Sequence, residues 1–362
     1  MTAFIPGLRL SEIFYREAVG PILARHSPRL TYSAALIGYG SDVLGYDTAR
    51  SMDHEWGPRL LLFIPDADAA RLAPELHELL RHELPKRVYG FSTNFGPTVE
   101  SGTRSMQPAD DGPIEHKVEV LSFSAFLRDR FGIDTYTDLT PVDWLTLTDQ
   151  ALLELTAGAV FHDGLGELQP MRAALAYYPD QIWRYRLAAQ WARIGELEAF
   201  VRRTAEVGDE IGSALVTAAL ARDLMRLAFL MERRYAPYPK WFGTAFARLL
   251  YGPELGRHLD AALAARSWPE REQGLTAVYR IAATMHNALD MTAPLPSDPT
   301  PFFGRPFLVI HGGEFAAAIR ETITDSDVLA LPRDAGGIDQ FVDSTAVLCH
   351  HRARLSTFYS IM

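Results

Sequence analysis

Two short motifs near the amino terminus carry the residue types that phosphate and metal chemistry require. A Gly-Ser pair, Gly40-Ser41, follows the apolar run 32–37, which is typical of a buried strand. Two acids, Asp53 and Glu55, then stand one residue apart. On an extended chain both side chains would leave the same face, and neighbouring carboxylates repel each other unless a cation lies between them. Because Mg²⁺ prefers oxygen ligands and commonly shares a phosphate, the pattern predicts a magnesium–nucleotide site.

A third acid, Glu119, lies on a separate predicted strand. Residues 116–123 alternate, with Val118 and Val120 on one face and Glu119 on the other face together with Lys117. A carboxylate placed there could act as the general base that takes a proton from a hydroxyl attacking an α-phosphate.

Each motif also has a plainer interpretation. A Gly-Ser pair after a strand is commonly a simple turn, and Asp53 and Glu55 could be solvated acids or helix caps. Glu119 could merely face solvent from an amphipathic strand. His54 lies between the two acids and is interpreted as a packed, structural histidine rather than a ligand. The combination of Gly40-Ser41 with the acids is what favours a site.

This combination resembles the nucleotidyltransferase superfamily, the polymerase-beta-like enzymes. Their pattern is a Gly-Ser loop, an Asp-x-Asp or Asp-x-Glu pair and an acid on a separate strand, matched here by Gly40-Ser41, Asp53-His54-Glu55 and Glu119. The spacing looks most like the kanamycin- and streptomycin-type aminoglycoside nucleotidyltransferases, which carry a helical domain after the catalytic one. The longer sequence around the acids resembles that of a bacterial branch of the superfamily, a branch known only as a domain of unknown function.

The resemblance implies a role for each matched residue. Gly40 and Ser41 would hold the phosphates of a nucleoside triphosphate, Asp53 and Glu55 would bind Mg²⁺, and Glu119 would be the base. The expected reaction moves a nucleoside monophosphate, AMP from ATP, to a hydroxyl of a small molecule or a protein.

A basic residue of the helical part completes the site in the antibiotic enzymes. Lys240 is the expected counterpart here, in the stretch Glu232-Arg-Arg-Tyr-Ala-Pro-Tyr-Pro-Lys-Trp241. Such a cluster at a helix junction is equally often simple packing.

Met52 and His54 depart from the family pattern, where an acid and an aliphatic residue are usual. Two other functions therefore stay open. One is a catalytically inactive nucleotide-binding regulatory or scaffold protein; the other is an antitoxin-like nucleotidyltransferase that acts on a partner protein or on RNA.

The elements that must position these residues follow from the hydrophobic pattern. The amino-terminal part alternates helix and strand patterns. A helix is expected directly after Ser41, and a strand is expected over 54–64 with an interruption at Gly57-Pro58, either a bulge or an edge strand. From about residue 140 long helical patterns dominate, and the best strand signals there are 157–161 and 307–310. We therefore expect residues 1–139 to form an α/β nucleotidyltransferase domain with a mixed sheet, and residues 140–362 to form an α-helical bundle.

Composition limits the class of protein. The 362 residues carry a formal net charge of −10, which argues against a nucleic-acid-coating role. The single cysteine, Cys349, permits no internal disulfide and suits a reducing cytoplasm. We expect neither a signal peptide nor a membrane span.

Overall fold

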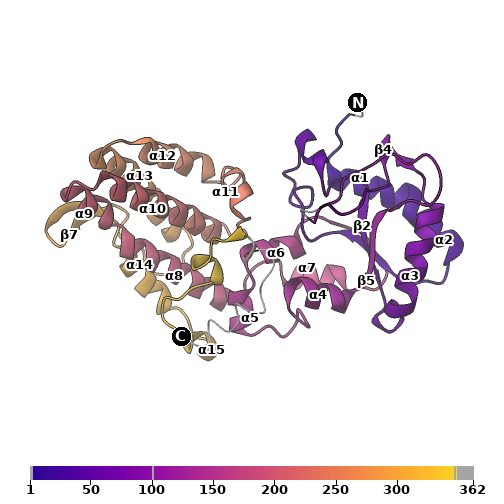
Figure 1. Ribbon diagram of the computed structural model, residues 1–362. Coiled ribbons are helices and arrows are strands. Elements are labelled where there is room, and N and C mark those ends of the chain that lie inside the picture. The colour runs from indigo at the N-terminus through magenta and orange to yellow at the C-terminus, as the bar shows by residue number, and fades with distance from the viewer. Residues whose placement is uncertain (1–2, 100–101, 346–347, 349–362) are drawn as a thin grey trace. The chain divides into compact units, whose positions relative to one another are not determined.

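The computed structural model describes residues 3–99, 102–345 and 348 (Figure 1). Contacts within the chain define two compact units. The first unit comprises residues 1–138 and 151–176, and the second comprises residues 139–150 and 177–362.

The first unit is built on a mixed four-stranded sheet in the order β5-β2-β1-β6. β1 pairs antiparallel with both β2 and β6, whereas β2 pairs parallel with β5, so that Leu61 lies opposite Glu119. The strand bounds are Ser33–Leu36 (β1), Arg59–Ile64 (β2), Lys117–Ser122 (β5) and Ala159–Asp163 (β6). A separate small hairpin joins Arg87–Val88 (β3) to Phe91–Ser92 (β4).

Helices cover both faces of this sheet (Figure 1). Leu60, Leu62 and Val118 pack against the amino-terminal helices and α3 in one apolar core. Phe63 points to the other face, where its ring lies 5.3 Å from that of Phe126 on α4. Alternation along the strands therefore directs every second side chain into one of two apolar layers. The helices are Gly7–Phe14 (α1), Gly20–His26 (α2), Asp66–Glu83 (α3), Phe123–Phe131 (α4) and Leu168–Ala174 (α7), with a π-helical segment, Tyr15–Val19, between α1 and α2.

The expectation of an extended Asp53-x-Glu55 segment is wrong. Asp53 ends a short 3₁₀ helix, Ala49–Asp53, whose first turn is capped by Thr48. Glu55 has φ 52°, a left-handed conformation, and β2 begins only at Arg59. The strand expected over 54–64 forms only beyond Gly57-Pro58, as β2, and it lies inside the sheet between β5 and β1, so the expected bulge or edge strand is wrong. Pro58, directly before β2, has no N–H to donate to a strand ladder.

The helix expected after Ser41 is also absent from the described segment that follows β1. Residues 38–45 form turns instead, with Gly40 at φ 133° and Gly45 at φ 70°. The side chain of Asp42 accepts the N–H of Val43 at 3.1 Å and so satisfies a backbone donor within the turn.

The strand expected at 157–161 forms as β6, two residues further on, and belongs to the first sheet. Ser33 Oγ on β1 donates a hydrogen bond of 2.9 Å to Asp163 on β6, and Asp163 also accepts the N–H of Gln169 at the start of α7. The chain therefore returns to the first unit after residue 150, and the helix Asp149–Thr156 (α6) crosses the division between the units.

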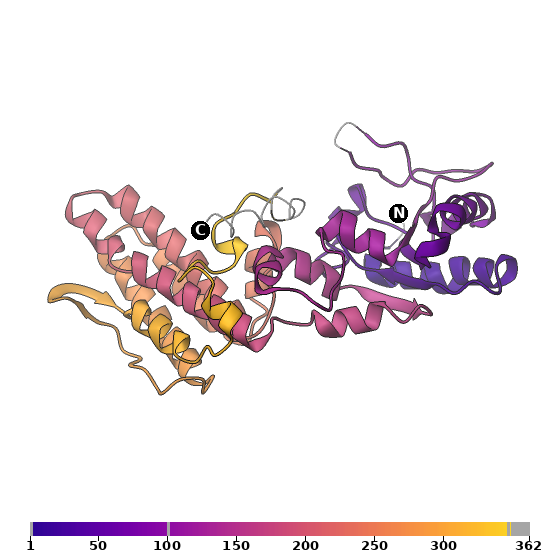
Figure 2. The ribbon, with the colours of Figure 1, turned by 90° about the horizontal axis from the view of Figure 1, so that it is seen from below.

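The second unit is helical, apart from one hairpin, throughout its described residues. The long helices α8, α10 and α13 pack as neighbours, with α14 against α8 and α12 against α13 (Figures 1 and 2). Its helices are Pro141–Thr146 (α5), Asp180–Leu197 (α8), Phe200–Glu206 (α9), Glu210–Met231 (α10), Pro239–Phe246 (α11), Gly252–Ala264 (α12), Trp268–Asn287 (α13), Gly312–Arg320 (α14) and Ser326–Leu329 (α15). The hairpin joins Thr300–Phe302 (β7) to Arg305–Val309 (β8), and Ile338–Gln340 forms a 3₁₀ turn.

None of the helices in the described part of the chain combines the length and apolar character that crossing a membrane requires.

Candidate functional site

The turn that carries Gly40-Ser41 is fixed by a buried ion pair. Arg59, the first residue of β2, binds both carboxylate oxygens of Asp42 at 2.6 and 3.0 Å and donates to the carbonyl oxygen of Tyr39 at 2.8 Å. A Cβ on Gly40 would lie 2.1 Å from Arg59 Nη2. Glycine is therefore required at position 40 both by its φ and by the approach of the guanidinium. Ser41 is half-buried, and its carbonyl accepts the N–H of Tyr46 at 2.8 Å.

A second carboxylate ties the far end of the same loop to α1. Asp47 Oδ2 accepts the indole N–H of Trp56 at 2.9 Å and the backbone N–H of Gly7 at 2.7 Å. Trp56 is itself buried. The loop from residue 38 to residue 56 is thus held at both ends by aspartates that the sequence motif does not include.

Asp53 points away from this framework. Its side chain is 61% exposed, and Nδ1 of the neighbouring His54 lies 3.0 Å from its carboxylate. His54 therefore contacts the acid beside it, in contrast to the expected packed histidine on an opposite strand face.

Glu55 is held by three donors. Its carboxylate forms an ion pair with Lys117 Nζ, accepts the backbone N–H of Arg104 at 2.6 Å and accepts the hydroxyl of Tyr39 at 3.3 Å. Its own N–H donates to the Arg104 carbonyl at 2.8 Å. The loop that follows β4 thereby positions Glu55 through Arg104, and Lys117 on β5 balances the charge of its carboxylate.

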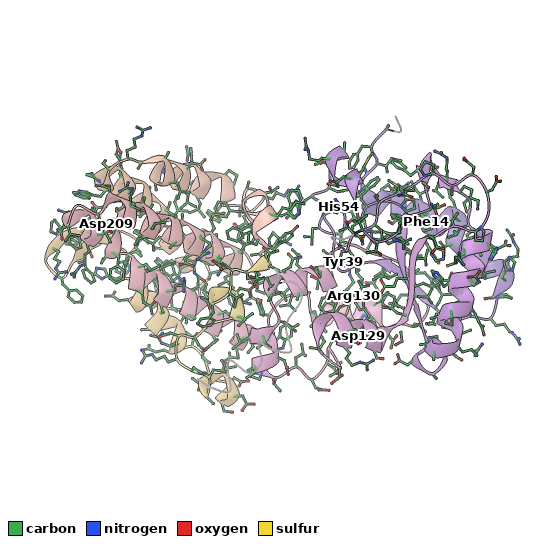
Figure 3. All side chains as sticks on the ribbon, in the orientation of Figure 1. Phe14, Tyr39, His54, Asp129, Arg130 and Asp209 are labelled. Carbon is green, nitrogen blue, oxygen red and sulfur yellow. The ribbon has the colours of Figure 1, made fainter. Side chains whose placement is uncertain are left out.

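Glu119 lies on the same face of β5 as Lys117. Its half-exposed side chain pairs with Arg130 near the end of α4, eleven residues further along the chain. Because α4 begins directly after β5 and packs against it, Arg130 near the end of the helix reaches Glu119 on the strand. Arg130 also lies over the ring of Tyr39, 5.5 Å from the centroid (Figure 3).

Part of this cluster lines a cavity of about 470 Å³ in the first unit, and Glu55 stands behind Lys117 without lining it. Four cationic side chains and one carboxylate line it: Arg59, Arg104, Lys117, Arg130 and Glu119. Tyr39 contributes an exposed aromatic ring. Burial lowers the pKa of Lys117 to about 8, a value that leaves most of it protonated at neutral pH.

His116 also lines the cavity but adds no charge. Burial lowers its pKa to about 4. Its Nδ1 accepts the N–H of Val118 at 3.1 Å, which leaves Nε2 to donate to the carbonyl of His77 at 3.0 Å. Both ring nitrogens are therefore engaged in structural hydrogen bonds.

The residues proposed for Mg²⁺ do not fit that ion in this arrangement. The described part of the chain contains no group of three or more His, Cys, Asp or Glu side chains placed to hold a metal. Glu55 and Glu119 each have a cationic side chain as partner, and Asp53 lies beside His54. The structure thus brings Glu55 and Glu119 to one charged cluster, whereas Asp53 is directed into solvent.

Lys240 belongs to the second unit, at the start of α11, with its Nζ 5.1 Å from the centroid of the Trp241 ring. That unit has its own cavity of about 360 Å³, into which Arg222 and Arg226 of α10 project. Arg222 pairs with Asp343 at 3.2 Å, and Arg226 donates to the carbonyl of Asp339. Cys349 lies outside the described residues.

Several residues of the first-unit cluster belong to no sequence motif. The alternation of β5 places Lys117 beside Glu119, but it gives no sign that Lys117 reaches Glu55, 62 positions earlier. Arg130 could have been suspected, because a helix that follows a strand directly packs back onto it. Arg59 and Arg104 have no comparable signal in the sequence.

One family model matches the chain. It is described as "Domain of unknown function (DUF4037)" and matches residues 144–242. The match runs from α5 into α11, so it includes Lys240 but not the Gly-Ser loop or the three acids. No curated protein matches the chain.

Proposed function

We propose that the first unit binds a nucleoside triphosphate and transfers its nucleoside monophosphate, AMP from ATP, to a hydroxyl. The cationic cavity is the observation that carries this proposal. Four basic side chains converge there beside a Gly-Ser turn and a strand carboxylate, which is the residue chemistry that a polyphosphate and an acceptor hydroxyl require.

The cationic side chains suit distinct parts of the nucleotide. Arg104, Lys117 and Arg130 can each donate charge-assisted hydrogen bonds to phosphate oxygens. The exposed ring of Tyr39, 5.2 Å from the Arg59 guanidinium, offers a flat surface against which a base could stack. Glu119 is the candidate general base, because it is a half-exposed carboxylate that an acceptor hydroxyl can approach from solvent.

Mg²⁺ dependence stays a prediction from the sequence pattern. Because Glu55 and Glu119 are paired with cations, we assign no step of the reaction to the metal. The contribution of Lys240 likewise stays a prediction. The acceptor is a hydroxyl of a small molecule, such as an aminoglycoside, or of a protein.

A second candidate function is nucleotide binding without turnover, in a regulatory or scaffold protein. The same ion pairs favour it, because they neutralise the two carboxylates that a transfer reaction would use. Phosphate binding by the basic side chains does not require those carboxylates to be free.

Pyrophosphate release separates the two functions. The protein is incubated with each nucleoside triphosphate, Mg²⁺ and a panel of hydroxyl acceptors. We expect Glu119→Gln to lower the rate by about 10²–10⁴-fold. Asp53→Ala tests the metal role predicted from the sequence: the rate falls if Asp53 binds Mg²⁺, and it is unchanged if the exposed Asp53 side chain takes no part in the reaction.

Asp129→Asn is the matched control for this assay. Asp129 lies on α4 next to Arg130, its side chain is 71% exposed, and it does not line the cavity (Figure 3). Nucleotide binding with no pyrophosphate release above that of Glu119→Gln would reject transfer for the acceptors tested and favour the binding function.

A further inference from the structure

The carboxylates of the first-unit cluster are neutralised by the chain itself. Lys117 and Glu55 are largely buried, with side chains 12% and 23% exposed, and they form one pair. Arg130, 22% exposed, forms the second pair with Glu119. A charge held this far from water needs a partner, so Glu55 without Lys117 would be costly in the empty protein.

Arg104 gives this cluster an unbalanced positive charge. Its guanidinium donates to three backbone carbonyls, those of Phe95, Gly96 and Glu115, at 2.8–3.2 Å. Among the described residues, no carboxylate lies within ion-pair distance of it. Neutral carbonyls satisfy three of its five N–H donors but do not balance its charge, so the cavity retains an attraction for an anion.

We propose that this cavity binds a polyphosphate without a divalent metal, with Lys117 as the built-in cation of the site. On binding, Lys117 and Arg130 exchange their carboxylates for phosphate oxygens, while Arg104 supplies the charge that is unbalanced in the empty protein. The proposal rests on the proposed nucleotide site but contradicts the metal ligation expected from the sequence.

The exchange is feasible because Glu55 keeps two donors when Lys117 leaves. The backbone N–H of Arg104 and the hydroxyl of Tyr39 still contact its carboxylate. Glu119 is half-exposed, so water can replace Arg130 around it. Each cation moves between two anionic partners and is never left unpaired.

This arrangement gives Glu55 an effect opposite to that of a metal ligand. If Glu55 competes with phosphate for Lys117, Glu55→Gln releases the lysine and tightens polyphosphate binding. If Glu55 instead ligates a metal that bridges to phosphate, the same substitution weakens binding. The sign of the change distinguishes the two roles.

Calorimetric titration with inorganic tripolyphosphate, in EDTA and then in Mg²⁺, tests the inference on the full chain. In EDTA we expect measurable binding by the wild type, a loss of about tenfold or more for Lys117→Met, and tighter binding for Glu55→Gln. Lys117→Arg keeps the charge and should retain most of the affinity. Asp129→Asn, which removes an exposed charge on α4, should bind like the wild type.

Circular dichroism and thermal unfolding of each variant separate lost binding from lost structure. No binding in EDTA by the folded wild type, or weaker binding by folded Glu55→Gln, would overturn the inference. If Lys117→Met does not fold, the tripolyphosphate affinities of Glu55→Gln and Lys117→Arg in EDTA still test the inference.

Tripolyphosphate binding and pyrophosphate release test separate claims, so the inference and the proposed transfer reaction can fail independently. Tripolyphosphate binding in EDTA together with absent pyrophosphate release supports the inference and rejects the transferase. Mg²⁺-dependent release together with absent binding in EDTA does the reverse.

Discussion

At the scale of single residues, the turn after β1 depends on one glycine. Gly40 has φ 133° and its α-carbon faces the Asp42–Arg59 ion pair, which is almost fully buried. Gly45, in the same loop, also has a positive φ of 70°, but no atom beyond the two adjacent residues lies within 4 Å of the position a Cβ would take. A substitution at Gly45 therefore introduces backbone strain alone, whereas a substitution at Gly40 introduces backbone strain together with a steric clash.

We predict that Gly40→Ala destabilises the protein much more than Gly45→Ala does. The first substitution strains the backbone and displaces a buried guanidinium, at a cost of about 3 kcal/mol, while the second adds only the left-handed strain of about 1 kcal/mol. Urea unfolding followed by circular dichroism measures both. Equal losses would show that the buried ion pair tolerates the added methyl group.

At the scale of elements, one carboxylate joins two helices of the second unit. Glu198, at the end of α8, accepts the backbone N–H groups of Ile310, His311 and Gly312 at 2.7–3.2 Å, where α14 begins. These donors and the helix dipole favour the ionised form. Burial outweighs them and raises the pKa of Glu198 to about 7.

This raised pKa predicts a pH-dependent stability. Between pH 4.5 and pH 7 the folded state binds more protons at Glu198 than the unfolded state does, so this group's contribution to stability falls as pH rises. From pH 5 to pH 8 the wild type should lose about 2 kcal/mol relative to Glu198→Gln, which has no titrating group. Urea unfolding of both proteins at the two pH values gives the difference, and a difference that is constant with pH would contradict the raised pKa.

At the scale of the whole molecule, the first unit is discontinuous in sequence. Residues 151–176 supply β6, the antiparallel neighbour of β1, together with buried apolar side chains such as Leu152, Leu168 and Met171. Each such side chain stabilises the fold by about 1.5–3 kcal/mol, which together is comparable with the whole stability of a typical domain.

We therefore predict that a fragment of residues 1–138 does not fold, whereas a fragment of residues 1–176 does. The shorter fragment leaves β1 unpaired on one side and lacks part of the core. Cooperative thermal unfolding and resistance to proteolysis report the difference. A cooperative transition in the 1–138 fragment would show that β6 is dispensable.

Much of the fold follows from local pattern. Alternation along residues 116–123 predicts β5 and its two faces, the apolar run 60–64 predicts β2, and the periodic apolar residues beyond 140 predict a helical second part. These features depend on residues close in sequence, where backbone sterics and side-chain periodicity act directly.

The sequence by itself therefore pointed to Glu55 and Glu119 as acids that could do chemistry and determined which strand carries Glu119 and Lys117. Only the tertiary structure decided that Lys117 pairs with Glu55, that Arg130 pairs with Glu119 and that β6 completes the first sheet. The physical reason is that charge pairing and strand pairing depend on distance in space. Neither the positive φ of Glu55 nor the return of the chain after residue 150 leaves a periodic signal that would place these partners together.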